Sequence, residues 1–331
     1  MQRGERVVKI RCGADIKPLP ITWLWPGWLP AGKLTILAGA AGTRKTTLAL
    51  ALAGVITTGG RWPDGRECKG GGNVMIWSSE DVADDTLVPR LIASGADLAR
   101  CHFIEGIAQD GESVPFDPSQ DIPDLRRAVD AIGGVSLLLI DPIVSAVAGD
   151  MHRANDVRRS LQAVVDFADA HGCAVIGITH FAKGGAGKAP QDRVIGSQAF
   201  GALARMVLVT AKEEGSNQRV MARAKSNIAP DDGGVAYSLE LGTIAGGIEA
   251  THAVWAVPSR ARRGKSWVTS STTTARVAAG AWTQSSSCAT CSPTGRCLHA
   301  KSRRMRTALA ILGLQCGAHK RPLAGQQLRE A

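Results

Sequence analysis

The feature that most restricts how this chain can fold is a glycine-rich segment near its start, Gly39-Ala40-Ala41-Gly42-Thr43-Arg44-Lys45-Thr46-Thr47. It follows an apolar run, residues 34–38, and precedes an Ala- and Leu-rich run, residues 48–55. A strand, a glycine-rich turn and a helix in this order form a phosphate-binding P-loop, in which backbone N–H groups and the helix N-terminus face the phosphates. The residues predicted to bind the nucleotide are Gly39, Gly42, Thr43, Lys45, Thr46 and Thr47.

Within this loop, Lys45 would reach the β- and γ-phosphates and Thr46 would hold Mg²⁺. One position departs from the motif G-x-x-x-x-G-K-[ST], because Arg44 stands where a glycine is expected before the lysine. A Cβ at that position strains the turn or crowds the phosphates. Two interpretations follow, an active ATPase or GTPase fold and a nucleotide-binding module with little or no turnover. A glycine-rich turn with a chance Lys-Thr pair is the structural alternative.

Apolar strand-like runs alternate with helical segments through the first 257 residues, which predicts an α/β fold with a mostly parallel sheet covered on both faces. The expected parallel strands are residues 34–38, 73–78, 101–104, 135–140, 173–179 and 206–210, and antiparallel strands are expected at 220–224 and 235–241. The expected helices are residues 48–55, 84–94, 123–132, 155–170 and 197–204, with Pro123 near a first turn.

Polar side chains end three of the expected strands. Asp141 closes an apolar run, where α/β sheets place ligands and where a carboxylate can hold Mg²⁺. Glu80 follows the strand after the P-loop helix, and a carboxylate there can act as a general base. His180 ends a third strand and can hydrogen-bond a phosphate. The structural alternatives are a capping Asp, a charge at a helix start for Glu80 and Asp81, and a histidine with a purely structural role.

Several short stretches, taken together and in order, resemble the RepA-like hexameric replicative helicases, a group of RecA-like P-loop ATPases common in plasmids, phages and integrated elements. The resemblance covers about residues 18–257. The matching stretches are the P-loop, Trp23-Leu24-Trp25-Pro26-Gly27, Trp77-Ser78-Ser79-Glu80-Asp81, Pro89-Arg90-Leu91, Ile140-Asp141-Pro142, Thr179-His180-Phe181-Ala182-Lys183-Gly184, Arg193-Val194-Ile195-Gly196-Ser197 and Arg223-Ala224-Lys225-Ser226-Asn227.

The resemblance implies ATP and Mg²⁺ as cofactors, with Lys45 and Thr46 on the nucleotide and Asp141 on the metal. It also implies that Glu80 is the catalytic base and that His180 senses the γ-phosphate. The implied activity is that of an ATP-dependent DNA helicase or helicase-like replication ATPase that acts on single-stranded DNA. A primase or a replication initiator is a further expected partner.

A ring of identical subunits, expected to be a hexamer, is also implied, because an arginine would act on the neighbouring subunit's nucleotide. Arg205 is the first candidate, with Arg223 or Lys225 as the others, and solvated charge at a strand end is the alternative for all three. Residues 183–193 would line the pore and contact DNA phosphates through their basic side chains, unless they form an ordinary solvent loop.

The last 74 residues differ from the rest in charge. Residues 258–331 contain 13 Lys and Arg and one acid, which leaves 26 basic and 28 acidic residues in the first 257. The expected organisation is a lead at 1–17, an ATPase domain at 18–257 and a basic tail of low order at 258–331. The tail has three interpretations: a disordered DNA-binding arm, a zinc site at Cys288, Cys291, Cys297 and His299, or an out-of-frame translation of a winged-helix end.

Composition also bears on location. No apolar run reaches the roughly 18 residues of a membrane span, and no apolar signal core follows the first residues. The eight scattered cysteines do not form the pattern of a secreted disulfide framework. The sequence therefore predicts a cytoplasmic protein without a membrane partner.

Overall fold

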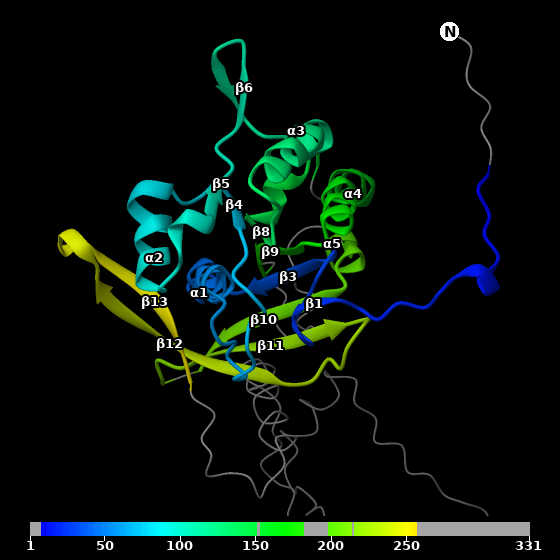
Figure 1. Ribbon diagram of the computed structural model, residues 1–331. Coiled ribbons are helices and arrows are strands. Elements are labelled where there is room, and N and C mark those ends of the chain that lie inside the picture. The colour runs from blue at the N-terminus through cyan, green and yellow to red at the C-terminus, as the bar shows by residue number, and fades with distance from the viewer. Residues whose placement is uncertain (1–7, 151–152, 182–197, 214, 257–331) are drawn as a thin grey trace, which may run out of the picture. The chain divides into compact units, whose positions relative to one another are not determined.

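The computed structural model describes residues 8–150, 153–181, 198–213 and 215–256, and a nine-stranded sheet runs through them (Figure 1). The order of its strands is β13-β12-β11-β10-β3-β9-β8-β4-β5. These strands are β3 (Leu34–Gly39), β4 (Val74–Ser78), β5 (Cys101–Phe103), β8 (Leu137–Asp141), β9 (Ala174–His180), β10 (Met206–Lys212), β11 (Arg219–Ser226), β12 (Gly234–Thr243) and β13 (Glu249–Trp255). The pairings from β10 to β5 are parallel and those from β10 to β13 antiparallel. The predicted α/β fold with a mostly parallel sheet is confirmed.

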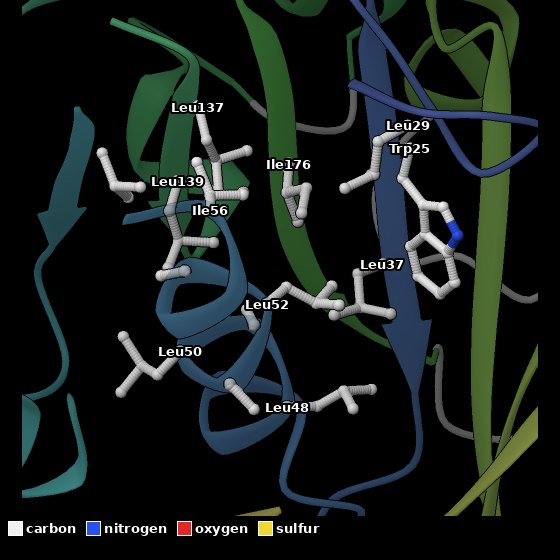
Figure 2. Close-up of a cluster of buried hydrophobic side chains, with 14 of the residues drawn as sticks. Trp25, Leu29, Leu37, Leu48, Leu50, Leu52, Ile56, Leu137, Leu139 and Ile176 are labelled. Carbon is white, nitrogen blue, oxygen red and sulfur yellow. The ribbon is translucent and has the colours of Figure 1, made fainter. Parts of the chain in front are cut away.

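Helices cover both faces of the sheet, as the apolar strands require. They are α1 (Lys45–Thr58) and α2 (Val88–Ala93) on one face, and α3 (Pro118–Ala131), α4 (Ala154–His171) and α5 (Gln198–Leu203) on the other. The side chains of β8 show the division, because successive residues of a strand point to opposite faces. Leu138 and Ile140 pack in the cluster that includes α3 and α4, whereas Leu137 and Leu139 pack against α1 (Figure 2).

Helix α1 is buried on nearly all sides and carries the phosphate loop at its start. Leu48, Leu50, Leu52 and Ile56 are fully buried between the sheet and the surrounding elements (Figure 2). Burying one such side chain stabilises the fold by about 1.5–3 kcal/mol. The helix ends at Thr58 and is capped by Gly59, whose left-handed φ of +66° suits a residue without a Cβ. Because α1 is held this firmly, its N-terminus is fixed beside the carboxyl ends of the parallel strands.

Two predicted helices begin elsewhere than expected. The helix predicted at 123–132 begins at Pro118, because the Asp117 side chain accepts a hydrogen bond from the Ser119 N–H and so caps the helix there. Pro123 therefore lies inside α3 rather than in its first turn. The helix predicted at 84–94 starts as a π-helical turn, Ala83–Leu87, and becomes α-helical at α2, next to Pro89, which has no N–H to donate.

The structure also contains elements that the sequence did not predict. One is the edge strand β13. The others are two small hairpins, β1 (Trp23–Trp25) with β2 (Leu29–Pro30) and β6 (Ile107–Gln109) with β7 (Glu112–Val114). Short 3-10 turns occur at Gly13–Asp15, Leu98–Arg100, Ile143–Ala146 and Ala245–Gly247.

Other predictions concern residues outside the described ones, namely the first seven residues, the pore segment 183–193 and the basic tail 258–331 with its candidate zinc ligands. Within the described ranges, no helix combines the length and the apolar character that crossing a membrane requires.

Candidate nucleotide-binding site

The phosphate loop follows β3 and turns tightly into α1. At Gly39, a Cβ would lie 2.9 Å from the carbonyl oxygen of Thr210, so only glycine fits this close approach. Gly42 has a φ of +79°, a conformation that favours glycine. The Thr43 hydroxyl closes the turn by donating to the Ala40 carbonyl oxygen at 2.9 Å. The glycine pattern in the sequence therefore corresponds to real backbone requirements.

Arg44 occupies the position at which the backbone is left-handed. Its φ is +60° and its ψ is +48°, directly before the first residue of α1. For a residue with a Cβ this conformation is unfavourable by roughly 1–2 kcal/mol. The expected strain at this departure from the motif is thus present, while the Arg44 side chain itself is exposed.

Lys45 directs its ammonium group into the concave side of the loop. Its Nζ lies 3.3 Å from the carbonyl oxygens of Gly39 and Ala40 and 3.2 Å from Nδ1 of His180. The residue is only 5% exposed. Burial lowers the pKa of Lys45, although the negative charges of Asp141 and Glu80 act in the opposite direction and raise it. No ion pair to Lys45 occurs among the described residues, so this buried ammonium suits a polyanionic ligand such as a triphosphate.

Thr46 and Asp141 meet across the start of α1 and the end of β8. The Thr46 hydroxyl donates to Oδ2 of Asp141 at 2.6 Å. Burial raises the pKa of Asp141 to about 6, although the bond from Thr46 opposes this shift. Thr47, the other threonine predicted to bind the nucleotide, is buried in the first turn of α1.

A hydroxyl and a carboxylate are ligand types that Mg²⁺ accepts, together with phosphate oxygens and waters. The described part of the chain holds no group of three or more His, Cys, Asp and Glu side chains that could bind a metal ion. The Thr46 hydroxyl and the Asp141 carboxylate fit one side of such a Mg²⁺ site.

Glu80 lies in the loop after β4, beside this pair. Its side chain is exposed, and its negative charge adds to burial in raising the pKa of Asp141. The neighbouring Asp81 is used differently, because its carboxylate forms an ion pair with Arg90 at 2.8 Å. Within the described ranges, no ion pair or side-chain hydrogen bond engages the Glu80 carboxylate. Its role as catalytic base remains a prediction.

His180 ends β9, the strand that lies between the phosphate-loop strand β3 and the Asp141 strand β8. Its register partner in β3 is Gly39. Burial and the charge of Lys45 both lower the pKa of His180, so the neutral imidazole accepts the bond from Lys45. The structure thus brings together four predicted site residues: Lys45, Thr46, Asp141 and His180.

The three candidates for an arginine or lysine acting on a neighbouring subunit differ in their contacts. The Arg223 guanidinium donates to the carbonyl oxygen of Gly27 at 3.1 Å, and Lys225 donates to that of Gly201 at 2.8 Å. Both cations are therefore held within their own chain. Arg205 is exposed, and no side-chain hydrogen bond or ion pair of Arg205 occurs within the described ranges.

Two residues at the loop were missed by the sequence reasoning. The Thr210 hydroxyl lies 2.8 Å from the Thr43 hydroxyl, and the Tyr237 hydroxyl donates to the Thr43 carbonyl oxygen at 3.1 Å. Thr210 comes near the end of an apolar strand, as do Asp141 and His180, so this position was a usable signal. Tyr237 is the only tyrosine in the sequence, but nothing local predicts its contact.

Comparison with known proteins gives three findings. A family model described as an AAA domain matches residues 8–186, which include the phosphate loop, Glu80, Asp141 and His180. No curated protein sequence matches the chain. Among solved structures, the crystal structure of the RadB recombinase is similar at 18% identity with a TM-score of 0.43, covering 64% of this chain and 89% of that one.

Proposed function

Because this chain belongs to the AAA domain family, we propose that it binds ATP with Mg²⁺ at the phosphate loop and hydrolyses it. The observation that carries the proposal is the buried ammonium of Lys45, which faces carbonyl oxygens beside the Thr46–Asp141 pair. Bound phosphates would give this ammonium an anionic partner in place of neutral ones. Magnesium, when bound, would neutralise part of the phosphate charge, and Thr46 and Asp141 are the residues that would hold it.

Two further roles in the proposed reaction fall to Glu80 and His180. Glu80 accepts the proton of the attacking water, since its exposed carboxylate lies close enough to affect the pKa of Asp141. His180 contacts Lys45 directly and precedes the segment that begins at residue 182. A change at the phosphate end of the site would therefore reach that segment through His180.

We further propose that the protein works as a homohexameric ring on single-stranded DNA, as a replication helicase or helicase-like ATPase. Arg205 supports an action between subunits. Its N–H donates to the carbonyl oxygen of Leu34 at the start of β3, whereas the phosphate loop follows the end of that strand. A six-residue strand spans roughly 17 Å, so Arg205 lies far from its own phosphate loop, which is compatible with the proposed action on a neighbouring subunit's nucleotide.

Steady-state ATP hydrolysis with and without single-stranded DNA tests this function, with Lys45→Ala as the inactive control. DNA-stimulated turnover by the full chain supports the helicase-like ATPase. Mixing Arg205→Ala with Lys45→Ala subunits tests the action in trans, because mixed rings would contain sites with an intact Lys45 beside an intact Arg205. Activity in the mixture above that of either variant supports the arginine assignment, and its absence contradicts it.

The left-handed Arg44 favours a second candidate, a nucleotide-binding regulatory module without turnover. A strained residue next to Lys45 could hold ATP in a geometry unsuited to hydrolysis. Tight ATP binding with no hydrolysis, with or without DNA, would support the regulatory module over the ATPase.

A further inference from the structure

We infer that Tyr237 and Thr210 are positioning residues of the phosphate loop, which hold Thr43 so that Arg44 keeps its left-handed backbone. The effect of these contacts on ATP affinity rests on the proposed function, whereas the contacts with Thr43 do not. Both residues lie beyond the part of the chain that the family model matches.

Thr43 is held through its side chain and through its backbone. Its hydroxyl donates to the Ala40 carbonyl oxygen and is 2.8 Å from the Thr210 hydroxyl. Its carbonyl oxygen accepts a hydrogen bond from the Tyr237 hydroxyl at 3.1 Å. Thr43, Thr210 and Tyr237 are 4%, 1% and 0% exposed. Water therefore has little access to replace either bond.

The bond from Tyr237 acts on the peptide unit that precedes Arg44. The carbonyl of Thr43 and the N–H of Arg44 belong to one planar group, so fixing the carbonyl direction fixes that N–H as well. In a trans peptide the two point in opposite directions, and the Arg44 N–H is accordingly turned away from the buried Tyr237. On the other side of Arg44, its carbonyl oxygen accepts from the Leu48 N–H at 3.0 Å, the first bond of α1.

Arg44 is thus restrained at both of its peptide units, which explains how a residue with a Cβ remains at a φ of +60°. Strained backbone persists where surrounding structure over-determines it. Here part of the restraint comes from the antiparallel region, since Tyr237 lies in β12 and its ring packs near Trp255 of β13 at 6.0 Å. The phosphate loop therefore depends on residues about 200 positions away in the sequence.

The test removes single hydroxyl groups while keeping side-chain shape, with Tyr237→Phe and Thr210→Val in the full chain. ATP affinity is measured by titration calorimetry. Losing one buried hydrogen bond should weaken ATP binding about three- to tenfold. In an Arg44→Gly background, where the left-handed backbone no longer needs to be imposed, Tyr237→Phe should change ATP affinity less than about twofold.

Thr57→Val is the matched control. It removes a buried threonine hydroxyl that bonds the Gly54 carbonyl oxygen, at the opposite end of α1 from the phosphate loop. It should lower the melting temperature without changing ATP affinity. A residue with a merely structural role would behave like this control.

Equal ATP affinity in Tyr237→Phe and the unmodified chain would overturn the inference, as would an equal loss in the Arg44→Gly background. Amide hydrogen exchange measured without nucleotide distinguishes failure of this inference from failure of the proposed ATP-binding function. If the unmodified chain binds no ATP, Tyr237→Phe should still exchange the Leu48 amide several-fold faster, because that amide bonds Arg44. An unchanged exchange rate would then also overturn the inference.

Discussion

Replacing Arg44 with glycine should make the protein more stable and, as an ATPase, faster. Arg44 has a φ of +60° and a ψ of +48°, which is unfavourable for an L-residue by roughly 1–2 kcal/mol and not for glycine. Glycine also gives the unfolded chain more conformational freedom, which offsets about 0.4–1 kcal/mol of the stability gained by relieving this strain. At the middle of both ranges, the net gain in the free energy of unfolding is about 0.8 kcal/mol, or a rise of about 2 °C in melting temperature.

The ATPase rate should rise as well, because glycine relieves the backbone strain directly before Lys45. Arg44→Ala is the matched control, since it removes the guanidinium but keeps the Cβ that makes the backbone conformation unfavourable. Thermal unfolding and steady-state hydrolysis are measured on all three chains. We expect the increase in melting temperature for glycine alone.

Equal or lower stability of the glycine variant would refute the argument from backbone strain. A similar rise in turnover for Arg44→Ala and Arg44→Gly would assign the effect to the guanidinium instead. Lower turnover in both would show that the exposed arginine contributes to the reaction.

Three further substitutions follow from the geometry of the site. Lys45→Ala should abolish ATP binding in a calorimetric titration, because the phosphates lose their buried charge partner, and unaltered affinity would contradict the P-loop assignment. Glu80→Gln should retain binding but reduce hydrolysis about 100-fold or more. Asp81→Asn, which breaks the ion pair with Arg90, should leave hydrolysis largely unchanged. Asp141→Asn should stabilise the nucleotide-free chain, because burial raises the pKa of Asp141 to about 6 and folding then disfavours its ionised form. This gain should be absent below about pH 4, grow as the pH rises from about 4 to 6, and remain constant above about pH 6. Thermal unfolding of both chains across this pH range measures it. A lower melting temperature of Asp141→Asn above pH 6 would show that the carboxylate is stabilising instead.

The parallel part of the fold was predictable from the sequence, because strands that are buried on both faces consist of nearly continuous apolar residues. Residues 135–140 and 173–179 are such runs, and they form β8 and β9 with boundaries shifted by one or two residues. Strand β13 was missed because Thr251 and His252 interrupt its apolar pattern. Among the described strands it pairs only with β12, so its other side is an edge and its apolar pattern is weak.

The site was predictable where polar residues end buried strands, since the carboxyl ends of parallel strands meet at one edge. This placed Asp141 near Thr46 and His180 near Lys45. The contacts of Thr43 were not predictable in the same way. Its bond to Tyr237 joins residues 194 positions apart, and this pairing depends on the register of β12, which no local pattern specifies.

The contacts of Lys45 make nucleotide binding an exchange of partners rather than a simple addition. The ammonium already has two carbonyl oxygens and an imidazole nitrogen within 3.3 Å, so ATP must displace bonds as it forms new ones. The measured affinity is then the difference between two sets of interactions. The same internal partners would receive the ammonium when product phosphates leave, which lowers the free-energy cost of losing those phosphates. In the proposed ATPase, a phosphate site that supplies its own replacement ligands would favour departure of the nucleotide over its storage.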